Sequence, residues 1–147
     1  MSEFNKLIST LQNFPRKGKF KLNQHSSLTD VCNISRINDC SGVYLFYDDD
    51  TNELLYIGIS GRETSDGEIR HRKDGLWGRL VKGKQFGDFR RKTLVEQMKK
   101  EGILILRVEW FITYCHDVKE IPRQWEYELL RLFLIENNRL PKWNNEL

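Results

Sequence analysis

Two short runs of β-branched and aromatic residues, 42–47 and 54–59, constrain the fold of this 147-residue chain more than any other feature. Residues of these types favour extended strands. The segment between the runs, residues 48–52, reads Asp-Asp-Asp-Thr-Asn and consists of turn formers. Two strand-forming runs joined by so short a turn predict a β-hairpin.

The predicted hairpin brings two tyrosines together. If its turn is centred on Asp50, Tyr44 lies opposite Tyr56, and directly opposed side chains on one face have Cβ atoms roughly 4.5–5.5 Å apart. Gly42 and Gly58 pair in the same register and leave a patch without side chains, where a ligand could approach the backbone closely. On the hairpin alone, an aromatic pair that only packs is favoured over a functional pair.

The rest of the chain alternates helical and extended patterns. Three segments have a helical pattern: the first dozen residues, ended before Pro15, residues 89–100 closed by Gly102, and residues 122–137 opened by Pro122. Residues 103–113 predict a third strand, and residues 76–81 form a short segment. Two polar stretches, 15–27 and 60–75, are expected to be loops, and residues 28–37 show no clear period.

This order of elements predicts one α/β (α+β) domain over residues 1–147, in which helices flank a small, mainly antiparallel three-stranded sheet. Residues 1–41 would be an N-terminal helix and lead-in, and residues 42–144 the core. No apolar run approaches the roughly 20 residues that span a bilayer, and the first residues lack the pattern of a secretion signal. We therefore expect a cytoplasmic protein that does not enter membranes.

Three cysteines are present, Cys32, Cys40 and Cys115, and no two of them form a Cys-x-x-Cys pair. This spacing predicts neither a disulfide framework nor a zinc site, so we expect reduced thiols. His116 follows Cys115 directly, but neighbouring residues on a strand point to opposite faces, which argues against a shared metal.

Positive charge is concentrated in one part of the chain. Residues 70–92 hold nine Lys or Arg against two Asp, a local net charge of +7 in a chain of net charge +3. The nine are Arg70, Arg72, Lys73, Arg79, Lys82, Lys84, Arg90, Arg91 and Lys92. A patch of this kind can neutralise phosphates and release counterions on binding DNA. A solvated charged face explains the composition equally well.

The hairpin residues also resemble a known family signature. Gly42-Val43-Tyr44, eleven further residues and then Tyr56-Ile57-Gly58 are similar to the paired motif of the GIY-YIG nuclease superfamily, with Val in place of Ile in the first half. In that family an arginine, a glutamate and an asparagine follow in this order, and the matching residues here are Arg79, Glu126 and Asn144. The resemblance covers residues 42–144.

Two of these matches have alternatives. The stretch between Gly58 and Arg79 is longer than in compact family members, so Arg70 or Arg72 could take the arginine role. Glu128 competes with Glu126, but only Glu126 has the apolar spacing of the family helix, at the edge of a buried stripe.

The resemblance implies phosphodiester hydrolysis in DNA. Glu126 would hold Mg²⁺, or Mn²⁺, since hard cations prefer carboxylate and phosphate oxygens. Tyr44 would be the general base, although a free phenol has a pKa near 10 and needs neighbouring positive charge, supplied by Arg79 and the metal, to act at neutral pH. Tyr56 would hydrogen-bond phosphate or water, and Asn144 would support the site. His71 is an alternative proton carrier or a phosphate contact.

The expected partner is DNA, most simply double-stranded, bound by a monomer or homodimer through Arg79, His71 and the other basic residues of 70–92. A competing interpretation is a nucleic-acid-binding module that keeps the scaffold without catalysis. A protein-interaction domain anchored by the four tryptophans is a third.

Overall fold

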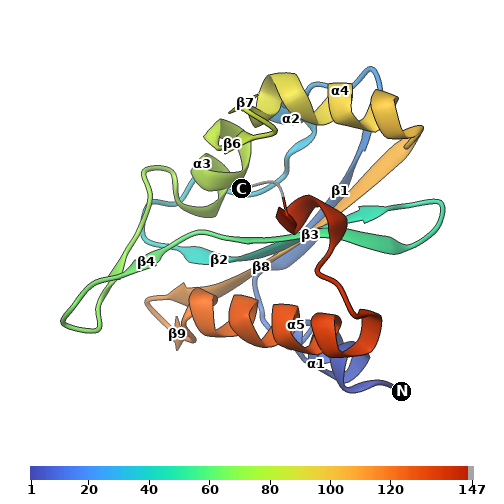
Figure 1. Cartoon of the computed structure of the whole chain (residues 1–147). Coiled ribbons are helices and arrows are strands. Elements are labelled where there is room, and N and C mark those ends of the chain that lie inside the picture. The colour runs from blue at the N-terminus through green and yellow to red at the C-terminus, as the bar shows by residue number, and fades with distance from the viewer. Residues whose placement is uncertain (146–147) are drawn as a thin grey trace.

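A five-stranded antiparallel sheet forms the centre of the part of the chain that the computed structural model describes, residues 1–145 (Figure 1). Four strands lie in the order β1-β8-β2-β3, and β9 pairs with β8. Their bounds are β1 Lys17–Asn23, β2 Ser41–Asp48, β3 Glu53–Ile59, β8 Ile105–Cys115 and β9 Val118–Lys119. The predicted hairpin is therefore present as β2 and β3.

Helices cover both faces of this sheet (Figure 1). Helices α1 and α5 lie on one face, and α3 and α4 on the other. The bounds are α1 Glu3–Leu11, α2 Leu28–Val31, α3 Gly75–Lys82, α4 Arg90–Glu101, α5 Pro122–Asn137 and a 3₁₀ helix, η1, Lys142–Asn145. The expectation of a mixed α+β fold with an antiparallel sheet is confirmed. Over residues 1–145, every helix is too short or too polar to span a membrane.

Two hydrophobic cores form because strand side chains alternate between the faces. Val43 and Leu45 pack with residues of α1 and α5, whereas Tyr44 and Phe46 pack with residues of α3 and α4. Strand β2 is buried along almost its whole length, since it lies inside the sheet with helices on both sides. The face of the hairpin that carries Tyr44 and Tyr56 therefore packs against α3 and α4.

Strand β1 was not expected, because residues 15–27 were predicted to be a loop. Along β1 the apolar residues Phe20 and Leu22 are buried, whereas their neighbours Lys19, Lys21 and Asn23 are exposed. A segment with only two apolar residues has a weak preference for the extended conformation. It forms a strand because its backbone pairs with β8, as in the pair Phe20 and Val108. The sheet consequently has more strands than the three predicted.

The hairpin register differs from the prediction by two residues. Tyr44 pairs with Gly58, and Phe46 pairs with Tyr56, with a bulge between Phe46 and Tyr47. A shift of two keeps every side chain on its face, so Tyr44 and Tyr56 remain diagonal neighbours with ring centroids 6.0 Å apart. The expected Gly42–Gly58 pair is wrong.

Two thin hairpins complete the fold: β4 Arg62–Glu63 with β5 Ile69–Arg70, and β6 Lys84–Gln85 with β7 Asp88–Phe89. The β4–β5 hairpin interrupts the predicted loop 60–75 and projects beyond the end of β3 (Figure 1).

The expectation of reduced thiols is also corrected, because Cys40 and Cys115 form a disulfide and Cys32 is free. The two cysteines are 75 residues apart in sequence. They become neighbours where β2 begins against β8, next to the pair Ser41 and Tyr114. This proximity depends on the tertiary fold and leaves no signature in the spacing of the cysteines.

Candidate active site

The ring of Tyr44 lies over Gly58. A Cβ atom on residue 58 would come within 2.6 Å of Tyr44 Oη, so only glycine leaves room for the ring. Tyr44 is fully buried, and its hydroxyl has no hydrogen-bond partner among the described residues. A buried polar group without a partner costs about 1–3 kcal/mol. The Tyr44 hydroxyl is therefore an unsatisfied hydrogen-bonding group, but its burial closes it to a ligand in this conformation.

Arg90 was expected to contact DNA, but its side chain is only 1% exposed. Its Nε donates to Gln85 Oε1 at 2.9 Å, and its Nη1 donates to the Leu80 carbonyl at 2.7 Å. The guanidinium lies 5.4 Å from the ring centroid of Tyr44 and 5.8 Å from that of Tyr56. Arg90 is thus a buried positive charge beside the two phenols and cannot be part of a surface patch.

Tyr56 is half-buried. Burial raises the pKa of Tyr56 to about 12, and the neighbouring Tyr44 adds to this rise, whereas the charges of Arg90 and Arg79 act in the opposite direction. Glu126 also acts on this phenol and raises its pKa. Three proposed site residues, Tyr44 on β2, Arg79 on α3 and Glu126 on α5, therefore lie close enough to Tyr56 on β3 to act on its charge.

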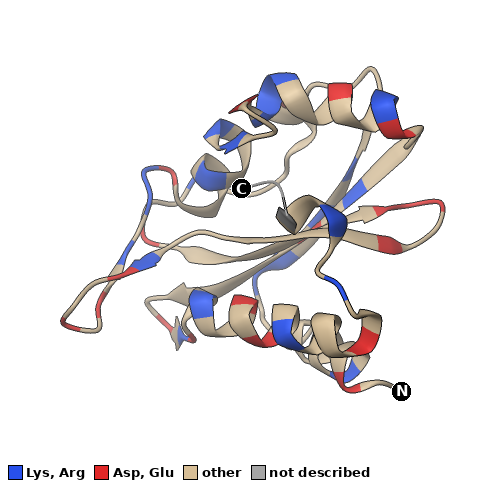
Figure 2. Cartoon of the chain, in the orientation of Figure 1, with Lys and Arg blue, Asp and Glu red and all other residues tan. Residues whose placement is uncertain are grey.

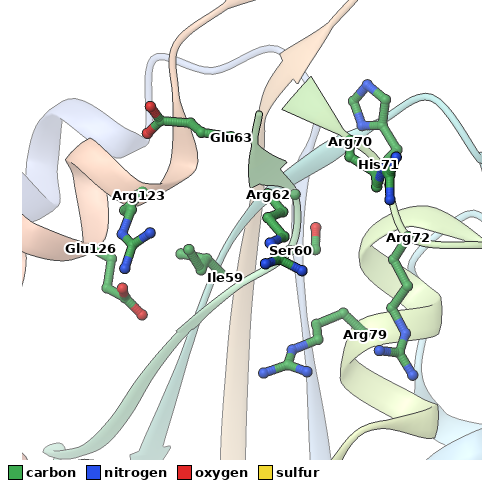
Figure 3. Close-up of a pocket in the computed structure, with 11 residues that line it drawn as sticks. Ile59, Ser60, Arg62, Glu63, Arg70, His71, Arg72, Arg79, Arg123 and Glu126 are labelled. Carbon is green, nitrogen blue, oxygen red and sulfur yellow. The ribbon is translucent and has the colours of Figure 1, made fainter. Parts of the chain in front are cut away.

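A cavity of about 470 Å³ opens at the end of β3, between α3, the start of α5 and the β4–β5 hairpin (Figure 3). Arg79 from α3 and Glu126 from α5 both line it. These helices cover opposite faces of the sheet, and both reach the cavity because it lies beyond the end of β3. The full lining is Ile59, Ser60, Gly61, Arg62, Glu63, Arg70, His71, Arg72, Arg79, Arg123 and Glu126.

The two competing glutamates of α5 have different surroundings. Burial raises the pKa of Glu126, and the charges of Arg123 and Arg79 oppose this rise. Glu128 lies outside the cavity lining and accepts a hydrogen bond at 3.1 Å from Arg131 Nε, and this contact lowers its pKa. Glu126 is therefore the carboxylate of this helix that faces the cavity.

Asn144 does not line the cavity. Its Oδ1 accepts a hydrogen bond from the backbone N–H of Ile57 at 2.9 Å, and its Nδ2 donates to the Ile57 carbonyl at 2.9 Å. Beside it, the Trp143 ring is buried and packs against Phe46. Asn144 thus holds the outer edge of β3 between Tyr56 and Gly58, and its contribution to the site is positional.

The nine basic residues of 70–92 separate into groups (Figure 2). Arg70, Arg72 and Arg79 line the cavity and Arg90 is buried. Four others lie on α3, β6 and the start of α4. Lys82 is paired with Asp74 and Lys92 with Asp88. Lys84 and Arg91 lie beside the exposed ring of Phe89. Lys73 is exposed. The predicted patch is therefore divided among the cavity lining, the surface of α3, β6 and α4, the exposed Lys73 and the buried Arg90.

His71 lies on the cavity wall with its Nδ1 2.6 Å from Ser41 Oγ. Burial lowers the pKa of His71 from its usual value of 6.5. This shift favours the neutral imidazole, which can accept a proton.

Two cavity arginines were missed by the sequence analysis, Arg62 and Arg123. Arg123 precedes Glu126 by three residues on α5, and residues three apart on a helix are neighbours, so this spacing could have identified it. Arg62 lies on β4, a strand of two residues inside a polar stretch, which has no periodicity to place it.

The donor set of the cavity fits a Mg²⁺ ion that arrives with phosphate. Glu126 and Glu63 are the carboxylates of the lining, and Mg²⁺ commonly binds one or two carboxylates, substrate phosphates and several waters. A second cluster, Cys115, His116 and Asp117, fits a metal poorly. Its sulfur is in the disulfide and its carboxylate is paired with Arg16.

Comparison of the chain with protein-family models, with curated proteins and with solved structures finds no match.

Proposed function

We propose that this protein is a Mg²⁺- or Mn²⁺-dependent endonuclease that hydrolyses phosphodiester bonds in DNA. The observation that carries the proposal is the convergence of Arg79 and Glu126, from opposite faces of the sheet, in one cavity at the end of a hairpin that bears Tyr44 and Tyr56. These are the residues that the GIY-YIG resemblance selects. Their convergence was not required by the sequence pattern.

Each residue has a defined role in this chemistry. Arg79 would bind the scissile phosphate through its planar guanidinium. Tyr44 would take the proton of the attacking water, with the buried Arg90 guanidinium supplying positive charge beside the ring. Glu126 would hold the metal ion, which stabilises the negative charge that develops at the phosphate. Asn144 would keep β3, and with it Tyr56, in position.

The test is nicking of supercoiled plasmid DNA by purified protein with Mg²⁺, with Mn²⁺ and with EDTA. Glu126→Gln is expected to abolish metal-dependent nicking and leave DNA binding intact, because it removes the anionic ligand and keeps the shape. Glu128→Gln is the matched control, since Glu128 is paired with Arg131 on another surface. Nicking that survives Glu126→Gln, or that EDTA does not stop, would contradict the metal role.

A second candidate is a DNA-binding module without catalysis. The observation in its favour is the complete burial of Tyr44, because a general base must reach the water that it deprotonates. Retention of DNA in a salt-dependent manner, without cleavage of plasmid, single-stranded or branched DNA under any metal condition, would support this alternative. Near-parental nicking by Tyr44→Phe would instead transfer the base role to Tyr56 or His71.

A further inference from the structure

The β4–β5 hairpin places two arginines directly opposite each other. Arg62 pairs with Arg70 across the two strands, and both residues line the cavity (Figure 3). Like charges in directly opposed positions destabilise a strand pair. The ladder contains only two residue pairs, and isolated hairpins are marginally stable. The opposed arginines therefore repel each other in a hairpin of two residue pairs, and an anion bound between them would relieve this repulsion.

The cavity arginines are also without partners. In the described chain, no carboxylate lies within ion-pair distance of Arg62, Arg70, Arg72, Arg79 or Arg123. Elsewhere, by contrast, Arg16 and Arg107 bind carboxylates at 2.8 and 2.7 Å. Five guanidinium groups and two carboxylates share the cavity lining, so its net charge favours an anion of more than one charge.

We infer that the β4–β5 hairpin is a clamp that closes on consecutive phosphates of a nucleic-acid strand, with Arg62, Arg70 and Arg123 forming a phosphate subsite beside Arg79 and Glu126. Guanidinium groups bind phosphate oxygens in pairs of parallel hydrogen bonds. Phosphate contacts carry no base-sequence information, and the lining holds no Phe, Tyr or Trp ring on which a base could stack. Affinity at this subsite is therefore independent of base sequence.

This inference rests on the proposed function and deepens it, since it says where the DNA backbone next to the scissile phosphate binds. Its test needs only a measurement of binding and no cleavage. The experiment is done in EDTA, so that no cleavage takes place, with a fluorescein-labelled 20-mer duplex and anisotropy measured at several salt concentrations. The double variant Arg62→Gln/Arg70→Gln is compared with Lys99→Gln/Lys100→Gln. The lysine pair removes the same charge from exposed positions in the last turn of α4.

Each phosphate contact contributes about −0.9 to the slope of log K against log salt for duplex DNA. Loss of two contacts should therefore flatten the slope by roughly 1.8 in the arginine variant, for two unrelated base sequences alike. The lysine variant should keep the parental slope. Arg62→Lys/Arg70→Lys, which keeps the charge and loses the paired hydrogen bonds, should retain the slope at reduced affinity. A parental slope in Arg62→Gln/Arg70→Gln would overturn the clamp.

Position and ligand are tested with duplexes that carry one neutral methylphosphonate at successive steps. Two adjacent steps should weaken binding to the parent and have no effect on the Arg62→Gln/Arg70→Gln variant. A different outcome is that no methylphosphonate step weakens binding and that inorganic pyrophosphate binds in the cavity without displacing the labelled duplex. The site would then hold a free anion, and the nucleic-acid clamp would be wrong. A flattened slope together with no cleavage in Mg²⁺ would leave the clamp in place and remove the nuclease proposal.

Discussion

Substituting Gly58 tests the central arrangement of the site, because the Tyr44 ring occupies the space that any side chain at position 58 would need. A Cβ atom there would lie 2.6 Å from Tyr44 Oη, and van der Waals contact begins at 3.4 Å. The ring must therefore move by roughly 1 Å in a core where Phe46 and Arg90 pack against it. Overpacking of this kind costs about 1–3 kcal/mol.

We expect Gly58→Ala to lower the free energy of unfolding by about 1–3 kcal/mol, measured by urea denaturation, and to remain folded, because single domains are stable by about 5–15 kcal/mol. The cause is isolated by a double-mutant cycle with Tyr44→Leu. Leucine lacks the phenol carbons and oxygen that conflict with the new methyl group. In that background Gly58→Ala should be neutral, or stabilising by up to about 1 kcal/mol, because alanine is favoured over glycine within a strand.

The cycle therefore predicts that the cost of Gly58→Ala disappears or reverses when the Tyr44 ring is removed. If Gly58→Ala costs the same in the parent and in Tyr44→Leu, the ring does not lie over residue 58 and the proposed site geometry is wrong. DNA binding should persist in Gly58→Ala, since residue 58 is buried and does not itself line the cavity, whereas cleavage should fall because the hydroxyl is displaced.

Three further substitutions probe the same region. Tyr44→Phe removes a hydroxyl without a described partner, so stability measured by urea denaturation should be unchanged or higher, while plasmid cleavage should slow by at least about 100-fold. Because burial raises the pKa of Glu126, the folded state favours its protonated form, and the stability from this group is lost as pH rises through that pKa. Glu126→Gln should therefore raise the thermal midpoint at pH 8 but not at pH 4, and an equal gain at both would contradict this cause. Arg90→Met should lower the free energy of unfolding, measured by urea denaturation, by about 1–3 kcal/mol, because the Leu80 carbonyl loses its hydrogen-bond donor. DNA affinity should not change, and a lower affinity would mean that Arg90 contacts DNA after all.

Much of the secondary structure could be predicted from local pattern. Helix α5 has the predicted bounds, because Pro122 fixes its first turn and the apolar residues repeat along it. The hairpin register could not be predicted. Two registers that differ by two residues bury the same side chains, and the choice depends on the bulge after Phe46. Strand β1 could not be predicted for a related reason, since the segment around Phe20 and Leu22 forms a strand by pairing with β8, which is distant in sequence.

The candidate site was partly predictable for similar reasons. Glu126 could be chosen over Glu128, because one helix presents the two residues about 200° apart. Arg90 could not be separated from its exposed neighbour Arg91, since composition does not show which of two adjacent basic side chains turns into the core. The pairing of Arg62 with Arg70 depends on a hairpin of two residue pairs, which is too short to leave a periodic signal.

The two hydrogen bonds between Asn144 and Ile57 also have a consequence for the protein's behaviour in concentrated solution. Strand β3 is at the margin of the sheet, where free backbone groups can recruit a strand from another molecule. The Asn144 amide occupies both groups of Ile57, as a neighbouring strand would. Asn144→Leu should therefore destabilise the fold and also leave the backbone N–H and C=O of Ile57 free to pair with another molecule. Self-association, measured by light scattering, should then rise with protein concentration.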